Sequence, residues 1–423
     1  MAHAYDKYLK KRAELDRWQL VSGSLDGIEQ VVVIPVLAEH AFLFHTLESL
    51  GANPTHELRR TLIVCVVNNR RPPLSPPEEI EENRRILDLL EAAIHGRPLL
   101  QNTGAGASSL RLAYVDASSP GLELPEKGGV GLARKIGMDW AISIFSRSER
   151  TDDTVSVLIS LDADTLVEPS YLRAIRSHFD KPGAWAAVIS YAHQTGGSET
   201  ERAAIKCYEL FLRCHMLGLQ YAGSPYAFHT IGSAIACSAD AYVAVSGMNR
   251  RRAGEDFYFL QQLAKTGSVD HITDTIVHPS ARASSRTPFG TGRRVSSFLD
   301  RRDEAYLAYH PESYAILKHW LDVVKTGLAD DADQLLARAR HIHPELARFL
   351  DDQGFSRAWR RLRENSSDRD ALHAQFHRWF DGLKTLKLIH HLRDHGYPEQ
   401  NVLDSIAWLL EAAGPPGDGS IDA

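Results

Sequence analysis

The chain has 423 residues, of which 43% are hydrophobic and 24% are charged, and its formal net charge is −6. This composition is typical of a globular protein with at least one large core, and the length suggests roughly two or three domains. It excludes a disordered chain, and the net negative charge gives no support for a general nucleic-acid or membrane-surface binder.

The four cysteines, Cys65, Cys207, Cys214 and Cys237, have no CxxC spacing. We interpret them as reduced core thiols, which favours the cytosol. The N-terminal segment is a charged amphipathic helix and not a signal peptide. No stretch reaches the ~20 consecutive apolar residues of a membrane span. We therefore expect a soluble, cytoplasmic protein with no membrane span and no nucleic acid as partner.

Short apolar runs rich in β-branched residues predict buried strands. They cover residues 31–35, 61–67, 110–115, 155–159 and 186–191. Segments with helical character alternate with them, and Pro169 fits the first turn of a helix that begins near Glu168. This alternation predicts an α/β fold with a mostly parallel, doubly wound sheet.

Beyond about residue 298 no strand pattern is present. Leu372, Phe376, Trp379, Leu383 and Leu386 have the spacing of one long amphipathic helix. We therefore predict an N-terminal helix (1–28), an α/β domain (29–297), a helical appendage (298–413) and a disordered tail (414–423).

Asp162 and Asp164 directly follow the fourth predicted strand. In an open α/β sheet, ligands bind beyond the carboxyl ends of the strands. Two carboxylates separated by one residue suit a hard divalent cation that keeps positions open for phosphate oxygens. The alternative is that one of them caps the next helix.

Four segments in chain order resemble glycosyltransferase family 2, which has the GT-A fold. They are VVVIPVLAEHAFLFHTLESL, the glycine-rich Gly128–Gly137, LDADTLVEP, and AGEDFYFLQQLAKTGSV. The resemblance covers roughly residues 29–280. The chain departs from the family at Ala38 and Lys135, where asparagine is usual, at Gln262, where arginine is frequent, and at Asn68-Asn69, where two aspartates are usual.

The resemblance implies an inverting glycosyltransferase that uses Mn²⁺ or Mg²⁺ and a nucleotide-sugar donor, a UDP- or GDP-sugar. It implies that Asp164 ligates the metal and bridges it to the diphosphate, and that Asp162 contacts the ribose or a water near the metal. Glu39 would hold the nucleoside, with Pro35 beside it. Arg134 would grip phosphate or ribose, since a planar guanidinium suits both, or it is a surface arginine of its helix.

Asn68 and Asn69 weaken the usual inference of a uracil base, because an amide donates as well as accepts. They remain candidates for the nucleoside site, and a structural role as turn residues is the alternative. The donor base therefore stays open.

The resemblance further implies that Asp256 is the general base that deprotonates the acceptor hydroxyl, with Glu255 as its alternate or as an acceptor ligand. The alternative is that both acids favour the N-terminus of their helix. Since the chain lacks membrane helices and a QxxRW segment, we expect a single transfer to an acceptor that the sequence does not identify.

The resemblance to GT-A enzymes also makes His278, after the last core segment, a candidate metal ligand, and a structural histidine is the alternative. Arg282, Arg286, Arg293 and Arg294 lie in a glycine-containing loop. They would close over the diphosphate, or they belong to a solvated basic loop.

Other interpretations remain open. A sugar-phosphate nucleotidyltransferase would need a G-x-G-T-R loop after the first strand, where PVLAEH stands instead. A non-catalytic nucleotide-sugar-binding or scaffold protein would fit the departures from the family. The helical appendage would shape the acceptor site or form a homodimer contact. His391 and His395 have a metal-compatible spacing, but no HExxH glutamate accompanies them.

Overall fold

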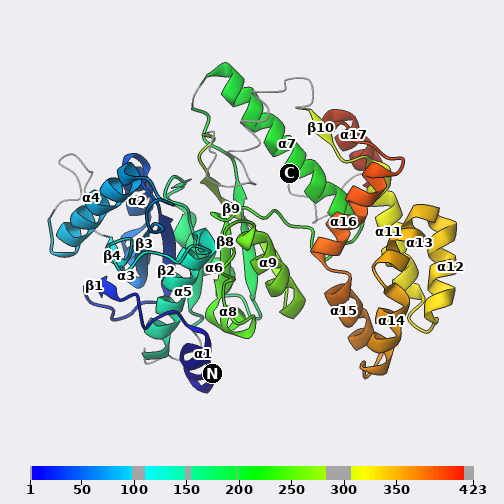
Figure 1. Cartoon of the computed structure of the whole chain (residues 1–423), viewed down its shortest axis with the longest axis horizontal. Coiled ribbons are helices and arrows are strands. Elements are labelled where there is room, and N and C mark those ends of the chain that lie inside the picture. Colours follow the sequence, from blue (N-terminus) through cyan, green and yellow to red (C-terminus); the bar gives the residue numbers. More distant parts are fainter. Residues whose placement is uncertain (1, 98–109, 148–153, 197, 283–305, 414–423) are drawn as a thin grey trace. The chain divides into compact units, whose positions relative to one another are not determined.

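The structure is a computed structural model that describes residues 2–97, 110–147, 154–196, 198–282 and 306–413 (Figure 1). The chain divides into two compact units. The first comprises Met1–Gly197 and Thr230–Arg293, and the second comprises Ser198–His229 and Arg294–Ala423. Within the described ranges, none of the helices has the length and apolar character that crossing a membrane requires. The predicted tail, 414–423, lies outside the described residues.

One nine-stranded sheet forms the core of the first unit, in the order β1-β4-β3-β2-β5-β8-β7-β9-β6. The strands are β1 (Leu20–Ser22), β2 (Gln30–Val36), β3 (Thr61–Asn68), β4 (Arg111–Ala117), β5 (Val157–Ser160), β6 (Leu166–Val167), β7 (Ala186–Tyr191), β8 (Ile235–Ser238) and β9 (Val269–His278). Every residue of β2, β3 and β5 is buried, as expected of strands covered on both faces. The predicted α/β class with a largely parallel sheet is confirmed.

Six strands, β2, β3, β4, β5, β7 and β9, run in the same direction and bring their carboxyl ends to one side of this sheet. β2 pairs in parallel with β3 and with β5, β3 pairs in parallel with β4, and β7 pairs in parallel with β9. β8 is antiparallel to both β5 and β7, so these two strands run the same way. The segments that follow these six strands therefore begin at the same edge, which is where open α/β sheets bind ligands.

Eight helices complete this unit: α1 (Ala2–Arg12), α2 (His40–Gly51), α3 (Thr55–Arg60), α4 (Pro77–Ile94), α5 (Val130–Arg147), α6 (Tyr171–Phe179), α8 (Ala239–Ala244) and α9 (Glu255–Thr266), counted among the described residues. Right-handed crossovers place α2 and α4 on one face of the sheet and α5 on the other. A Cβ atom at Gly137 would lie 3.0 Å from the Val66 side chain and nearer still to Val33. Glycine at this position therefore lets α5 pack directly on β2 and β3.

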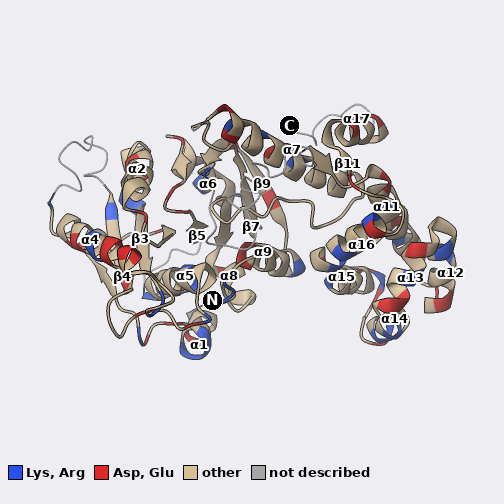
Figure 2. Ribbon diagram, turned by 45° about the horizontal axis from the view of Figure 1, so that its top comes forward, with Lys and Arg blue, Asp and Glu red and all other residues tan. Residues whose placement is uncertain are grey.

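Two predicted elements begin or end elsewhere. Helix α1 covers Ala2–Arg12 and ends in a basic turn (Figure 2), whereas Leu20–Ser22 joins the sheet as β1, so the predicted helix over 1–28 is too long. Helix α6 begins at Tyr171 and not near Glu168, because the preceding residues form β6 and pair with the end of β9.

A buried polar network holds α1 against α5. The Lys135 ammonium lies 3.0 Å from Asp139 Oδ2, and the hydroxyls of Tyr8 and Tyr242 donate to Asp139 Oδ1 at 2.6 and 2.8 Å. All four side chains are buried. A buried charge is tolerated when it is paired and fully hydrogen-bonded, so Lys135, a departure from the family, has a structural partner in this chain.

The second unit is helical. It contains α7 (Glu199–Tyr221), α11 (Pro311–Thr326), α12 (Ala332–Ile342), α13 (Pro344–Asp352), α14 (Phe355–Glu364), α15 (Arg369–Trp379), α16 (Gly382–Asp394) and α17 (Val402–Ala413). The short strands β10 (Leu307–Ala308) and β11 (Gln400–Asn401) pair in this unit, where no strand was predicted. The unit also includes α7, which lies within the predicted 29–297 domain.

The predicted single helix around Trp379 is two helices, α15 and α16. Asp381 separates them, because its carboxylate accepts a hydrogen bond from the Lys384 backbone N–H and so caps α16. The hydrophobic spacing continues across this break, which is why the sequence pattern suggested one helix. Elsewhere in the unit, Gly218 allows α7 to approach α11, since a Cβ there would lie 2.6 Å from the Tyr314 ring.

All four cysteines are free and buried, as predicted. Burial raises the pKa of Cys65 and of Cys214 to about 12. These thiols are therefore protonated and unreactive at neutral pH.

We expect the second unit to lose stability between pH 6.5 and pH 4. Burial, and then the nearby His390, lower the pKa of His215 to about 4, and its Nδ1 contacts the Tyr314 hydroxyl at 2.8 Å. As the pH falls through this window, His215 takes up a proton in the unfolded chain but stays neutral in the folded chain. The free energy of unfolding therefore falls by roughly 3 kcal/mol by pH 4. Urea unfolding of His215→Gln across this range should show a shallower pH dependence than wild type. The same change at exposed His319 is the control, and equal slopes for wild type and His215→Gln would contradict the assignment.

Candidate active site

Buried Arg134 on α5 joins two acidic segments of the first unit. One guanidinium nitrogen pairs with Glu255 Oε1 at the start of α9, and the other lies 2.5 Å from Asp162 Oδ1, directly after β5. Burial alone would lower the pKa of Arg134, but Asp162, Glu255 and Asp256 outweigh burial and raise it. Arg134 is thus a permanently charged, buried side chain of the sheet edge and not a surface arginine.

Arg282 provides a second cation at this edge. Its Nη2 pairs with Glu39 Oε1, which follows β2, and lies 3.0 Å from Asp164 Oδ2. The guanidinium also lies 4.4 Å from the centre of the Phe42 ring on α2, a favourable cation–π position. Each aspartate of the LDADT segment therefore contacts a different arginine.

Gln194, which follows β7, connects the aspartate loop with the end of β9. Its side-chain amide donates to the carbonyl oxygens of Asp164 and His278, both at 2.8 Å. The loop is further held by the Thr46 hydroxyl, which donates to the Ala163 carbonyl at 2.9 Å. These contacts hold the backbone of the aspartate loop from both sides.

Three carboxyl groups of the site, those of Asp164, Glu255 and Asp256, have raised pKa values. Burial, followed by the charge of Asp162, raises the pKa of Asp164 to about 6, although Arg282 opposes the shift. Burial, followed by the charge of Glu255, raises the pKa of Asp256 to about 7, although Arg134 opposes it. Strongly shifted carboxyl groups that lie together at a sheet edge are typical of a functional site.

The predicted metal ligands Asp162, Asp164 and His278 do not form a compact cluster of three donor atoms among the described residues. His278 Nδ1 donates to the Ala192 carbonyl at 2.9 Å, and its Nε2 lies 3.8 Å from Glu168 Oε1. Asp162 and Asp164 face arginines. The two carboxylates suit a hard cation, whereas both nitrogens of the His278 ring face other groups, the Ala192 carbonyl and the Glu168 carboxylate.

Asn68 and Asn69 are buried and hold the ends of the strands together. The Asn68 amide donates to the Val36 carbonyl at 3.0 Å. Asn83 on α4 donates to Asn69 Oδ1 at 2.9 Å and accepts from the Ala38 backbone N–H at 2.8 Å. These contacts favour the structural interpretation of the asparagine pair. They also involve Ala38, which has a left-handed backbone with φ of 49°.

The remaining predicted residues differ in what the structure says of them. Pro35 is buried inside β2, opposite Val66 of β3. Arg286 and Arg294, like Arg293, lie outside the described residues. Gln194 and Asn83 were not predicted as site residues. The available signal for Gln194 was its position as a polar residue shortly after β7. Asn83 lies in the middle of helix α4, where an asparagine gives no sign of a site.

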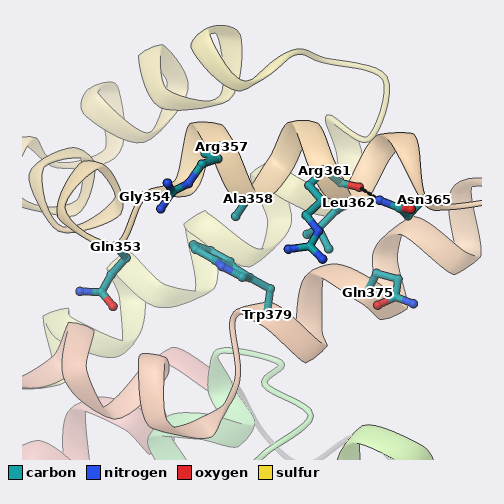
Figure 3. Close-up of a pocket in the computed structure, with 9 residues that line it drawn as sticks. All are labelled: Gln353, Gly354, Arg357, Ala358, Arg361, Leu362, Asn365, Gln375 and Trp379. Atoms are coloured by element: carbon teal, nitrogen blue, oxygen red, sulfur yellow. Dashed lines mark hydrogen bonds between the residues drawn. The ribbon is translucent and has the colours of Figure 1, made fainter.

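The second unit contains a pocket of about 520 Å³ between α14 and α15. Figure 3 shows the Trp379 indole in this pocket, with Arg357 and Arg361 of α14 beside it. The Asn365 amide donates to the Arg361 carbonyl at 2.7 Å and closes the end of α14. The pocket contains none of the predicted site residues, so we seek the chemistry at the carboxyl ends of the strands.

No protein-family model and no curated protein matches this sequence. The chain is similar in structure to residues 1–349 of S. aureus TarS in complex with UDP-GlcNAc, with 10% identity, a TM-score of 0.40, and coverage of 84% of this chain and 91% of that one. It is similar to a mannosyltransferase, PcManGT from Pyrobaculum calidifontis, in complex with GDP-Man and Mn²⁺, with 13% identity, a TM-score of 0.39, and coverage of 97% and 92%. It is also similar to the M. tuberculosis glucosyl-3-phosphoglycerate synthase, with 14% identity, a TM-score of 0.33, and coverage of 71% and 84%.

We expect Gly232→Ala to displace the Arg134 guanidinium without replacing any charged residue. A Cβ at this position would lie 2.6 Å from Arg134 Nη1 and closer to Nη2. The guanidinium must move away from Glu255 and Asp162, which should cost roughly 1–3 kcal/mol of unfolding free energy. Urea unfolding measures this loss. Gly23→Ala, where no atom lies within 4 Å, is the control, and equal stabilities of the two variants would contradict the prediction.

Proposed function

We propose that the chain is a GT-A glycosyltransferase that moves a sugar from a nucleotide-diphosphate donor to an acceptor hydroxyl, with a divalent metal. The observation that carries this proposal is the pairing of Asp162 and Asp164 with two different arginines at the carboxyl edge of the sheet. Arg134 links Asp162 to the Glu255-Asp256 segment. The metal, the diphosphate and the acceptor hydroxyl would then bind at the same carboxyl ends of the strands.

Asp164 would hold Mn²⁺ or Mg²⁺, with Asp162 and His278 as further candidate ligands. The supporting observation is that Asp162, Asp164 and Glu39 gather negative charge, which contributes to the raised pKa of Asp164. Such a site favours a cation, and oxygen donors suit these two ions. When bound, the ion would neutralise charge on the departing diphosphate.

Arg282 would exchange partners when a donor binds. It now neutralises Asp164 and Glu39, and a diphosphate would compete for the same guanidinium, since arginine binds phosphate oxygens in a bidentate manner. Arg286 and Arg294, which follow Arg282 in the sequence and lie outside the described residues, would assist. Glu39 would then be released toward the nucleoside.

The nucleoside would lie at the ends of β2 and β3, near Pro35, Glu39, Asn68 and Asn69. The asparagine amides engage backbone groups, so we assign them the task of shaping this end of the site. The donor base, uracil or guanine, is left to experiment.

Asp256 would act as the general base. Glu255 is buried and held by Arg134, whereas Asp256 is partly exposed and its pKa of about 7 lies near the operating pH, as general-base catalysis requires. Attack on the sugar from the face opposite the diphosphate would invert the anomeric centre. A single transfer to an acceptor hydroxyl completes the proposed reaction.

Donor binding in the presence of Mn²⁺ tests the proposal. Calorimetry with UDP-, GDP- and dTDP-sugars should detect metal-dependent binding of one of them by the wild-type chain. Asp164→Asn should abolish it, because the variant loses the proposed metal ligand and its charge. Asp274→Asn, a change at an exposed acid of β9, should bind normally.

The outcomes separate the rival functions. Undiminished Mn²⁺-dependent binding by Asp164→Asn would refute the ligand assignment. Pyrophosphate-dependent release of a nucleoside triphosphate would identify a nucleotidyltransferase. Donor binding without hydrolysis or transfer to any acceptor would identify a non-catalytic binding protein.

A further inference from the structure

Three side chains of metal-ligating type meet in the second unit, and none of them belongs to the site proposed above. Glu345 lies at the start of α13, His391 lies in the last turn of α16, and His395 directly follows that helix. One donor atom from each lies within 4.8 Å of the other two. Among the described residues, this is the group of three acidic, histidine or cysteine side chains that meets such a spacing.

The two histidines face the same side because they are four residues apart. Their rings stack with centroids 4.2 Å apart and an interplanar angle of 23°. His391 Nε2 donates to Glu345 Oε2 at 3.0 Å. A divalent cation would replace this proton, since neutral imidazole and carboxylate are both ligands.

Hydrogen bonds with neighbouring groups orient the other donor atoms. His395 Nδ1 lies 2.8 Å from the His391 carbonyl oxygen. A carbonyl only accepts, so Nδ1 carries the proton and Nε2 carries the lone pair that a metal needs. Arg348 holds the other carboxylate oxygen of Glu345 at 2.9 Å, which leaves Oε2 directed at His391.

We propose that Glu345, His391 and His395 bind a divalent transition metal, with Zn²⁺ as the preferred ion. Two imidazoles and one carboxylate are a known donor set for zinc, with a fourth position for water. Donor atoms on a tetrahedral zinc lie about 3.4 Å apart, given Zn–N and Zn–O distances near 2.0–2.1 Å. His395 is exposed, so a small adjustment of its side chain would close the remaining distance.

The bound ion would join the start of α13 to the end of α16. These helices are linked here by the Glu345–His391 contact, and Phe349 of α13 also packs on the His391 ring at 5.7 Å between centroids. A metal that binds the folded unit and not the unfolded chain raises the unfolding temperature. The proposed role is therefore to stabilise the second unit, independently of the chemistry proposed for the first.

The chain supplies a matched control in the same unit. His373 and His377 on α15 are also four residues apart, and their Nε2 atoms lie 3.3 Å from each other. No carboxylate completes this pair as a group of three donors among the described residues. The His373–His377 pair therefore shows how much zinc a histidine pair binds without a carboxylate.

Zinc calorimetry and thermal unfolding of the full, tag-free, chelator-treated chain test the proposal. An Asp164→Asn background removes the contribution of the sheet-edge site. We expect one Zn²⁺ per chain and a rise in unfolding temperature of roughly 2 °C or more at saturating zinc. Glu345→Gln, His391→Gln and His395→Gln should each weaken zinc binding about tenfold or more.

The control variant His373→Gln should bind zinc as tightly as its parent. Unchanged affinity in Glu345→Gln and His395→Gln would overturn the proposal, as would an equal loss in His373→Gln. His395 is exposed, so His395→Gln should fold normally and keeps the test decisive if a change at the more buried His391 impairs folding.

Discussion

Replacing Asp256 by asparagine should lower the turnover of sugar transfer by about 10²-fold or more, while donor affinity is retained. Asparagine has nearly the shape of aspartate but accepts no proton from an attacking hydroxyl. Asp256 is half-buried at the start of α9, and its partial removal from water, followed by the charge of Glu255, raises its pKa to about 7. Steady-state kinetics with the donor identified by calorimetry measure the loss.

Asp240→Asn is the matched control, because Asp240 also lies in the first turn of a helix, α8. If Asp256 only favoured the helix N-terminus, both variants would lose a few tenths to ~1 kcal/mol of stability and neither would lose turnover. Near-normal turnover of Asp256→Asn would move the role of general base to Glu255 or to another group.

The pH dependence of turnover gives a second readout of the same group. A general base must be ionised, so with a pKa of about 7 the wild-type rate should fall about tenfold per pH unit below pH 7. In Asp256→Asn the residual rate should lack this acidic limb. An acidic limb that persists unchanged in the variant would assign it to another group.

Replacing Arg134 by methionine should remove about 3 kcal/mol or more of unfolding free energy. The change leaves the buried carboxylate of Glu255 without the cation that now pairs with it. Burial already raises the pKa of Glu255, and Arg134 opposes that shift, so the variant should raise it further. Because its folded state then holds a proton that the unfolded chain releases, the variant should lose more stability as the pH rises.

A double variant separates this charge effect from packing. Arg134→Met with Glu255→Gln removes both charges, and replacing both partners of a buried pair costs less than removing one. We expect the double variant to recover most of the lost stability. A double variant as unstable as Arg134→Met would mean that the arginine contributes through packing instead. Urea unfolding at pH 6 and pH 8 measures the stability of the wild type, of Arg134→Met and of the double variant.

The strands and most helices were predictable because their signals are local. The apolar runs that became β2, β3, β5 and β7 needed only residue type and spacing, and their order with the helices was enough for the α/β class. Predictions failed where a distant partner overrode local preference. Residues 166–167 became β6 because β9 supplied a strand to pair with, and Asp381 divided a continuous hydrophobic pattern into two helices.

The candidate site residues likewise divide into those with a local sequence signal and those that depend on a distant partner. Asp162, Asp164, Glu255 and Asp256 were recognisable from sequence as acids after a buried strand and at a helix start. Asn83 was not, because its importance depends on the backbone N–H of Ala38, 45 residues away. The left-handed backbone at Ala38 likewise has no signal in an alanine.

The sequence by itself determined which residues carry charge and which strand or helix end presents them, since hydrophobic period and residue chemistry act over a few neighbours. Only the tertiary structure decided which cation neutralises which acid. Arg134 and Glu255 are 121 residues apart, and Arg282 and Glu39 are 243 apart. Such pairs form because an unpaired charge buried at the carboxyl ends of the strands is costly. The partner is the arginine that the fold brings next to it.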